Sequence, residues 1–337
     1  MFRKILIANR GEIAVRIIRA ARELGIATVA VYSTADKEAL HTLLADEAIC
    51  IGPGKATESY LNINAILSAA VLTEAEAIHP GFGFLSENSK FATMCEEVGI
   101  KFIGPSAGVM DVMGDKINAR AQMIKAKVPV IPGSDGEVHT AEEALAVAEK
   151  IGYPVMLKAS AGGGGKGIRK VEKAEDLVSA FETASSEAKA NFGNGAMYLE
   201  RVIYPARHIE VQILADQMGH VIHLGERDCS LQRNNQKVLE ESPSIAIGKT
   251  LRNEIGAAAV RAAESVGYEN AGTIEFLLDE ATGKFYFMEM NTRVQVEHPV
   301  TEFVSGVDIV KEQIRIAAGQ PLTLKQEDIV QIGRAHV

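Results

Sequence analysis

The first hundred residues alternate short β-type runs with helical stretches, and this pattern restricts the possible folds more than any other feature of the sequence. Between two such runs, apolar residues recur at helical spacing from Ile13 to Leu24, and Gly25 ends the helix. Strands that alternate with helices imply a parallel sheet with helices on its faces. Residues 1–114 are therefore predicted to form an α/β domain with a doubly wound parallel sheet. Its strands are expected at residues 4–8, 27–32, 46–51, 75–79 and 101–103.

The pattern changes near residue 115, where a second domain is expected to begin. Strands now follow one another with few helices between them, which is typical of an α+β domain. Its predicted helices lie at 140–151 and 251–266, with another that ends near 190. Its predicted strands lie at 154–158, 167–171, 197–201, 208–215, 221–226 and 272–278. We place this domain at residues 115–330, with residues 331–337 as a tail.

The charge and hydropathy of the chain argue against several functions as its main role. The 337 residues carry 35 basic and 44 acidic side chains, so the net charge is −9. Such a chain is poorly suited to binding nucleic acid or an anionic membrane surface. Its apolar runs are far shorter than the roughly 20 residues of a membrane span. No secretory signal precedes the first strand, and Cys50, Cys95 and Cys229 lack disulfide or metal spacing. We expect a cytoplasmic protein.

A glycine-rich segment runs from Ser160 to Gly167, between two predicted strands. Glycines allow positive φ angles and let backbone amides converge on an anion. The segment is not a P-loop, because Ser160 stands where the first glycine belongs, Gly167 follows Lys166, and no helix begins there. We interpret it as a flap over phosphates, and the alternative is a flexible turn.

Two alternating runs flank the turn-type pair Thr282-Gly283 and predict a β-hairpin. With the turn centred on residue 282, Glu275 lies opposite Glu289. Like charges that face each other destabilise a strand pair, and a bound cation resolves this conflict. Carboxylate and amide oxygens suit Mg²⁺ or Mn²⁺, so we expect a metal site at Glu275, Glu289 and Asn291. The alternative is a shifted register with two solvated glutamates.

Polar side chains continue at every second position after the hairpin, at Glu289, Asn291, Arg293, Gln295 and Glu297. The strand is predicted to continue to Glu297, so that these side chains share one face. Burying them without partners is costly. We interpret them as the lining of a polar active site, in which Arg293 binds an oxyanion and Glu297 acts as a base. A charged stripe on an exposed edge is the alternative.

Three lysines stand at positions that suit phosphate binding, namely Lys116, Lys158 and Lys237. Each lysine alone is more typical of a solvated surface. Lys158 is the exception, because it ends an apolar strand at the mouth of the glycine-rich segment.

These segments together resemble the biotin carboxylases, a family of ATP-grasp enzymes, over about residues 2–330. The stretch from Glu289 to Thr301 is highly specific for this family. The resemblance implies that residues 115–330 form an ATP-grasp domain with a glycine-rich lid at about 131–203. The matching stretches are Ile7–Ala14, His79–Asn88, the glycine-rich segment, Glu226–Ser230 and Glu289–Thr301.

The resemblance implies a reaction in which ATP phosphorylates bicarbonate to carboxyphosphate, and the CO₂ passes to N1′ of biotin. Mg²⁺ or Mn²⁺ would be held by Glu275, Glu289 and Asn291. The implied nucleotide contacts are Lys116, Lys158, Gly164, Gly165, Glu200, Arg201, Ile203, His208, Gln232, Asn235 and Leu277. The implied bicarbonate contacts are Lys237, Arg293, Gln295 and Val296. The implied catalytic residues are Lys237, Arg293, which stabilises the charged intermediate, and Glu297, which deprotonates bicarbonate.

The chain departs from the family at two places. Asn235 stands where some members carry a histidine near the ribose. Residues 331–337 break the family's pattern, and the family's last domain, with an arginine of the biotin site, does not follow. We therefore expect a C-terminally truncated carboxylase that binds ATP and is impaired in carboxylation.

The resemblance also implies partners. It favours the biotin carboxylase subunit of acetyl-CoA carboxylase in fatty-acid synthesis, a homodimer at full length. Its partners would be a biotin carboxyl carrier protein and carboxyltransferase subunits. One alternative is the first part of a multidomain pyruvate or acyl-CoA carboxylase. Others are a carbamoyl-phosphate synthase, a carboxylate–amine ligase and a non-catalytic ATP-binding fragment. The Arg-x-Gln-x-Glu-His-Pro stretch at 293–299 favours the biotin branch.

Overall fold

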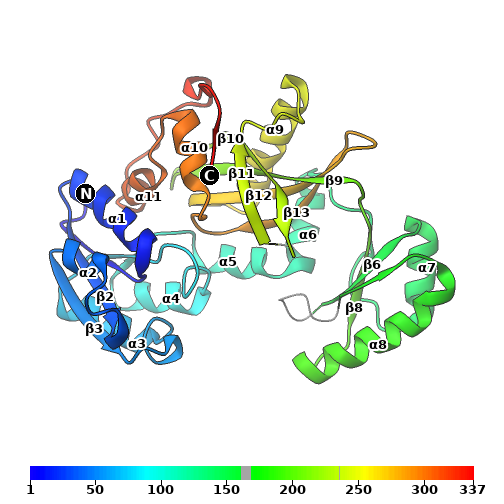
Figure 1. The fold of residues 1–337 in the computed structure, drawn as a ribbon, viewed down its shortest axis with the longest axis horizontal. Helices are drawn as coiled ribbons and strands as arrows, with labels where there is room; N and C mark the ends of the chain where they lie inside the picture. The colour runs from blue at the N-terminus through cyan, green and yellow to red at the C-terminus, as the bar shows by residue number, and fades with distance from the viewer. Residues whose placement is uncertain (161–167, 235) are drawn as a thin grey trace. The chain divides into compact units, whose positions relative to one another are not determined.

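The computed structural model describes residues 1–160, 168–234 and 236–337 (Figure 1). The described residues divide into two compact units that interleave along the chain. The first unit comprises Met1–Gly114, His208–Glu275 and Glu289–Val337, and the second comprises Asp115–Arg207 and Phe276–Met288. The predicted flap lies outside the described residues except for Ser160, as does Asn235.

The N-terminal part of the first unit contains the parallel sheet that the sequence predicts. Its strand order is β3-β2-β1-β4-β5, and each neighbouring pair is parallel. Parallel neighbours need a crossover between them, which the intervening helices supply. The strands are β1 (Lys4–Ile7), β2 (Ala27–Ser33), β3 (Glu47–Gly52), β4 (Ala77–His79) and β5 (Lys101–Phe102). All five fall on the predicted runs, so the doubly wound fold class is confirmed.

Helices cover both faces of this sheet because alternate residues of β1 point to opposite sides. Ile5 and Ile7 pack in the same core as α1 and α11. Leu6 and Ala8 pack in the core that α3 and α4 share. The helices of this region are α1 (Gly11–Glu23), α2 (Leu40–Leu44), α3 (Ile63–Leu72), α4 (Ser89–Glu97), α5 (Ala107–Gly114) and α11 (Ile309–Ala317).

A second sheet has the order β13-β12-β9-β10-β11-β14. The neighbouring pairs β9–β10, β10–β11 and β11–β14 are antiparallel. The strands are β9 (Ala206–Ala215), β10 (Val221–Arg233), β11 (Gln236–Ser242), β12 (Asn270–Asp279), β13 (Phe285–Asn291) and β14 (Ala335–His336). The helices that follow its strands are α9 (Lys249–Ser265) and α10 (His298–Ser305). The tail at 331–337 thus contributes an edge strand.

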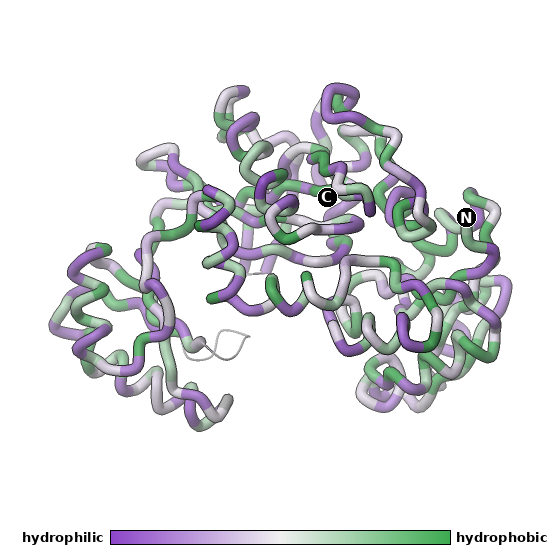
Figure 2. Tube along the Cα trace, turned by 180° about the vertical axis from the view of Figure 1, so that it is seen from behind, coloured by the Kyte–Doolittle hydropathy of each residue, from purple (hydrophilic) through white to green (hydrophobic). Residues whose placement is uncertain are grey.

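The second unit contains a small antiparallel sheet of order β7-β6-β8. Alternate residues of β6, Val155 and Leu157, share a core with α7 and α8. The turns of these helices change between hydrophilic and hydrophobic colour in Figure 2, as expected for helices with one buried face. The elements are α6 (Lys116–Lys125), α7 (Ala141–Ile151), β6 (Val155–Ala159), β7 (Ile168–Val171), α8 (Ala174–Phe192) and β8 (Met197–Arg201).

One sequence prediction is wrong: the strand does not continue to Glu297. β13 ends at Asn291, and Glu297 caps α10 with a φ of −80° and a ψ of 7°. Pro299 lies in the first turn of α10, where its fixed φ and missing N–H favour the start of a helix over an extended strand. Strand β11, which carries Lys237, was also not predicted as a strand.

Within the described ranges, no helix combines the length and the apolar character that crossing a membrane would require.

Candidate active site

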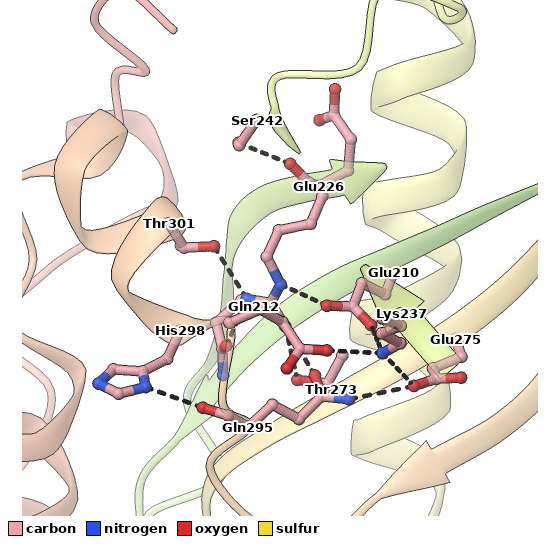
Figure 3. Close-up of polar contacts among 12 residues, drawn as sticks. Glu210, Gln212, Glu226, Lys237, Ser242, Thr273, Glu275, Gln295, His298 and Thr301 are labelled. Atoms are coloured by element: carbon pink, nitrogen blue, oxygen red, sulfur yellow. Dashed lines mark hydrogen bonds and ion pairs between the residues drawn. The ribbon is translucent and has the colours of Figure 1, made fainter. Parts of the chain in front are cut away.

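Lys237 is the centre of a polar cluster on the second sheet (Figure 3). Its Nζ lies 2.5 Å from an oxygen of Glu210, 3.0 Å from Glu275 and 2.6 Å from Glu297. Glu210, Glu275 and Lys237 come from β9, β12 and β11, and Glu297 caps α10. All three carboxylates are buried. The cluster therefore holds more negative than positive charge around one ammonium.

Glu275 collects donors from several directions. Its Oε1 accepts hydrogen bonds from Asn291 Nδ2 at 2.8 Å and from Gln295 Nε2 at 3.0 Å. Its Oε2 lies 2.8 Å from Nε2 of His208 on β9. Gln232 of β10 donates to Nδ1 of His208 at 2.7 Å, so the ring proton of neutral His208 is on Nε2 and points at Glu275.

The short-range charges of the cluster favour the ionised forms of Glu275 and Lys237. Burial disfavours the charged form of Glu275, but the hydrogen bond and charge of His208, followed by those of Lys237, lower the pKa of its carboxyl to about 2. Burial likewise disfavours the ammonium of Lys237, but Glu210 and Glu275 raise its pKa well above the usual range. Burial also opposes protonation of His208, yet Glu275 raises its pKa overall. Opposite charges at short range thus outweigh desolvation here.

Arg293 lies beside this cluster, next to Asn291. Its Nη2 donates to Asn291 Oδ1 at 2.9 Å, and its Nε lies 2.9 Å from Glu87. Val296 is 61% exposed. The structure therefore brings together Asn291, Gln295 and Glu297 around Lys237 without the continuous strand that the sequence predicted.

The groups that contact Glu275 are nitrogen donors, because Asn291 turns its Nδ2 to Glu275 and its Oδ1 to Arg293. The amide of Asn291 would have to turn over for its oxygen to join a cation at Glu275. Glu289 precedes Asn291 by two positions on β13, so the two share a face of the strand. Asn291 contacts Glu275, which places Glu289 on the face that carries Glu275. Two carboxylates and an amide oxygen are the donors that Mg²⁺ and Mn²⁺ prefer.

The second unit holds another charged pair among the predicted nucleotide contacts. Lys158 on β6 and Glu200 on β8 lie 2.5 Å apart, on neighbouring strands with the register Met156↔Glu200. The other predicted contacts of this unit are Lys116, the first residue of α6, Arg201 at the end of β8, Ile203 and Leu277 of β12. Gly164, Gly165 and Asn235 lie outside the described residues.

Sequence reasoning missed Glu210, which anchors Lys237, and Arg227, which contacts Glu210. The signal was present in β9, where His208, Glu210 and Gln212 alternate with apolar residues in an otherwise apolar run. Polar residues with period two on a buried strand indicate a polar site.

Two family models match the chain in succession. The model "Biotin carboxylase, N-terminal domain" matches residues 1–110, and "Carbamoyl-phosphate synthase L chain, ATP binding domain" matches residues 115–325. The fold and these two matches therefore place the chain in the ATP-grasp class of proteins.

Individual proteins with similar sequences and structures identify the family within this class. Biotin carboxylase 1 of Bacillus subtilis is 58% identical over 329 residues, which are 98% of this chain and 73% of the relative. The crystal structure of a biotin carboxylase–β,γ-ATP complex from Campylobacter jejuni has a TM-score of 0.94 and 53% identity, and covers all of this chain and 75% of that one. The chain belongs to the biotin carboxylase family.

A further neighbour is the biotin carboxylase domain dimer of Hydrogenobacter thermophilus 2-oxoglutarate carboxylase, solved with MgADP, ADP and bicarbonate. It has a TM-score of 0.92 and 54% identity, with 100% of this chain and 74% of that one covered. The family thus includes domains of larger carboxylases.

Proposed function

We propose that this chain catalyses the ATP-dependent activation of bicarbonate for the carboxylation of biotin. The observation that carries the proposal is the position of Lys237, whose ammonium bridges Glu297 at 2.6 Å and Glu275 at 3.0 Å. The ammonium of Lys237 thus lies between the candidate base, Glu297, and the candidate metal ligand, Glu275. A small anion such as bicarbonate could bind there, close to a metal-bound phosphate, and lose its proton to Glu297.

Glu297 acts as the base in this proposal. Its carboxylate takes the proton of bicarbonate, which makes the remaining oxygen a competent nucleophile. That oxygen bonds to the γ-phosphorus of ATP, the bond to the β-phosphate oxygen breaks, and ADP leaves carboxyphosphate behind. The CO₂ unit then passes to N1′ of biotin, with release of phosphate and a proton. Arg293 and Lys237 offset the negative charge of the intermediate.

The proposed nucleotide contacts act through positioning and charge neutralisation, which dominate phosphoryl transfer. Lys116 and Lys158 would bind phosphates, together with the backbone of Gly164 and Gly165. Glu200, Arg201, Ile203, His208, Gln232, Asn235 and Leu277 would hold the rest of the nucleotide. Glu275, Glu289 and Asn291 would hold Mg²⁺ or Mn²⁺. When bound, this ion neutralises phosphate charge.

The test is ADP release by the purified chain, measured with Mg²⁺ and ATP, with and without bicarbonate, and with and without free biotin. Stimulation by bicarbonate supports the proposal. An ADP-release rate that does not respond to bicarbonate would leave the non-catalytic ATP-binding alternative as the better explanation. The same assay on the chain joined to the C-terminal quarter of a relative separates bicarbonate activation from biotin carboxylation.

We further propose that the biotin is carried by a carrier protein of acetyl-CoA carboxylase, with carboxyltransferase subunits as further partners. The family also includes domains of 2-oxoglutarate carboxylase. The choice of carrier protein therefore distinguishes a subunit of acetyl-CoA carboxylase from a domain of such a larger enzyme. Carboxylation of isolated carrier domains from the two kinds of enzyme, compared at equal concentration, should favour the acetyl-CoA carboxylase carrier. A preference for the other carrier would assign the chain to a multidomain enzyme.

A further inference from the structure

Arg227 is a fully buried arginine in the middle of β10, opposite Glu210 of β9. Burying a guanidinium is costly unless its charge is paired and its N–H groups are satisfied. Burial disfavours the charge, but Glu210 more than compensates and raises the pKa of Arg227. A buried charge of this kind needs a structural or functional reason.

The guanidinium of Arg227 distributes its N–H groups over several elements. Its Nε contacts Glu210 Oε1, and its Nη1 donates to Gln212 at 2.8 Å and to Thr301 at 2.9 Å. Its Nη2 donates to Thr273 at 3.1 Å and to Gln295 Oε1 at 2.7 Å. Figure 3 shows these labelled partners converging from β9, β12, α10 and the segment that follows β13. A planar fork of donors fixes the orientation of each acceptor.

Two of these acceptors reach directly into the candidate site. Glu210 gives one oxygen to Arg227 and turns the other to Lys237, 2.5 Å away. Gln295 gives its Oε1 to Arg227, so its Nε2 faces Glu275 at 3.0 Å. One guanidinium therefore determines which end of the Gln295 amide faces the site and which oxygen of Glu210 is left for Lys237.

We infer that Arg227 is a positioning residue of the bicarbonate site, which it orients through Gln295 and Glu210. This inference rests on the proposed function. Arg227 does not reach the nucleotide contacts of the second unit through any of these bonds. Its removal should therefore weaken bicarbonate binding far more than nucleotide binding, whereas a merely structural arginine would affect stability alone.

The test compares Arg227→Met, which keeps a long buried side chain without donors, with Arg227→Lys. Calorimetry gives the Kd of a non-hydrolysable ATP analogue with Mg²⁺, and then the Kd of bicarbonate in its presence. For Arg227→Met we expect a rise of at least tenfold in the bicarbonate Kd and a change within twofold in the nucleotide Kd. Arg227→Lys should be intermediate, because one ammonium restores the contact with Glu210 but not the whole fork.

Arg252→Met is the matched control. Arg252 of α9 donates to Glu226, the residue next to Arg227 on β10, at 2.7 Å. Its other hydrogen bonds go to the backbone oxygens of Ser244 and Ile247, outside the Lys237 cluster. This variant should leave the bicarbonate Kd within twofold. If folded Arg227→Met binds bicarbonate as tightly as the unmodified chain, the inference is overturned while the proposed function stands. If the unmodified chain binds no bicarbonate, both are overturned.

A second measurement covers variants that fail to fold. In the ¹⁵N-labelled unmodified chain with the ATP analogue and Mg²⁺, the Nε–H signal of buried Arg227 should shift when bicarbonate is added. The Nε–H signal of Arg252 should not shift. An unchanged Arg227 signal at saturating bicarbonate contradicts the inference.

Discussion

Glu297 illustrates how a single carboxylate is prepared for proton transfer at the residue scale. It is buried, and Lys237 holds it at 2.6 Å. Glu297→Gln should retain nucleotide binding and lose bicarbonate-dependent ADP release by roughly 10²–10⁴-fold, because the amide keeps the shape but accepts no proton. Steady-state ADP release measures this, with Glu264→Gln, a change at an exposed position of α9, as the control. An undiminished rate in Glu297→Gln would place the base elsewhere.

The candidate metal site makes a second prediction at this scale. Glu275→Gln removes the carboxylate that Lys237, Asn291 and Gln295 surround. We expect Mn²⁺ binding in the presence of nucleotide to weaken by about tenfold or more, because a neutral amide is a poorer ligand for a hard cation. Electron paramagnetic resonance of free Mn²⁺ measures this. Equal Mn²⁺ affinity in the variant and the unmodified chain would remove Glu275 from the ligand set.

The polar residues at every second position after the hairpin were enough to predict that Asn291, Gln295 and Glu297 lie near Glu275. It was not enough to predict Arg227 or Glu210. Their roles depend on the register Arg227↔Glu210 between β9 and β10, which contains an irregularity between His223 and Glu226. A register shift of one residue moves a side chain to the other face, and local pattern does not reveal such shifts.

At the scale of elements, the end of β13 shows that the predicted polar side chains come together although the predicted strand is wrong. Period-two spacing favoured a strand through Glu297, whereas Pro299 favoured a helix start. The helix prevails from His298, and the backbone between Asn291 and Glu297 contains a bend at Arg293 and a turn at residues 296–297. Gln295 and Glu297 still face Glu275 and Lys237 because their hydrogen bonds, and not the pleat of a strand, orient them.

Helix α4 offers a prediction about an element. Asn88 caps it, and its Oδ1 accepts a hydrogen bond from the backbone N–H of Phe91 at 2.8 Å. Asn88→Ala leaves that N–H without its partner and should cost about 1 kcal/mol of unfolding free energy. Urea unfolding followed by circular dichroism measures this. Lys90→Ala, an exposed change on the same helix, should be nearly neutral, and equal losses in both variants would argue against the cap.

At the scale of the whole molecule, the sequence predicted the kinds of sheet but not how the chain is shared between units. The N-terminal parallel sheet follows from local alternation of strands and helices. In contrast, residues 208–275 join the unit that contains residues 1–114, and residues 276–288 join the other. Such sharing depends on contacts between segments far apart in sequence, which a periodic pattern along one segment does not encode.

Two of the buried histidines of the first unit should make it sensitive to acid. His79 of β4 and His298 of α10 are buried, and among the described residues neither Nε2 has a hydrogen-bond partner. Burial lowers the pKa of His79 to about 3 and that of His298 to about 4. In the unfolded chain both imidazoles have a pKa of about 6.5. At pH values between the folded-state and the unfolded-state pKa, the unfolded chain binds more protons than the folded chain.

Stability should therefore be fully present above about pH 6.5 and fall as the pH drops toward 4, by up to about 1.4 kcal/mol per pH unit for each histidine. Urea unfolding at pH 7 and pH 5 measures the loss. His79→Gln and His298→Gln should each reduce that loss by about 2 kcal/mol, because glutamine binds no proton in either state. His220→Gln, at an exposed turn position, should leave the loss unchanged. If the buried and exposed variants lose stability equally between the two pH values, neutral burial of His79 and His298 does not control the acid response.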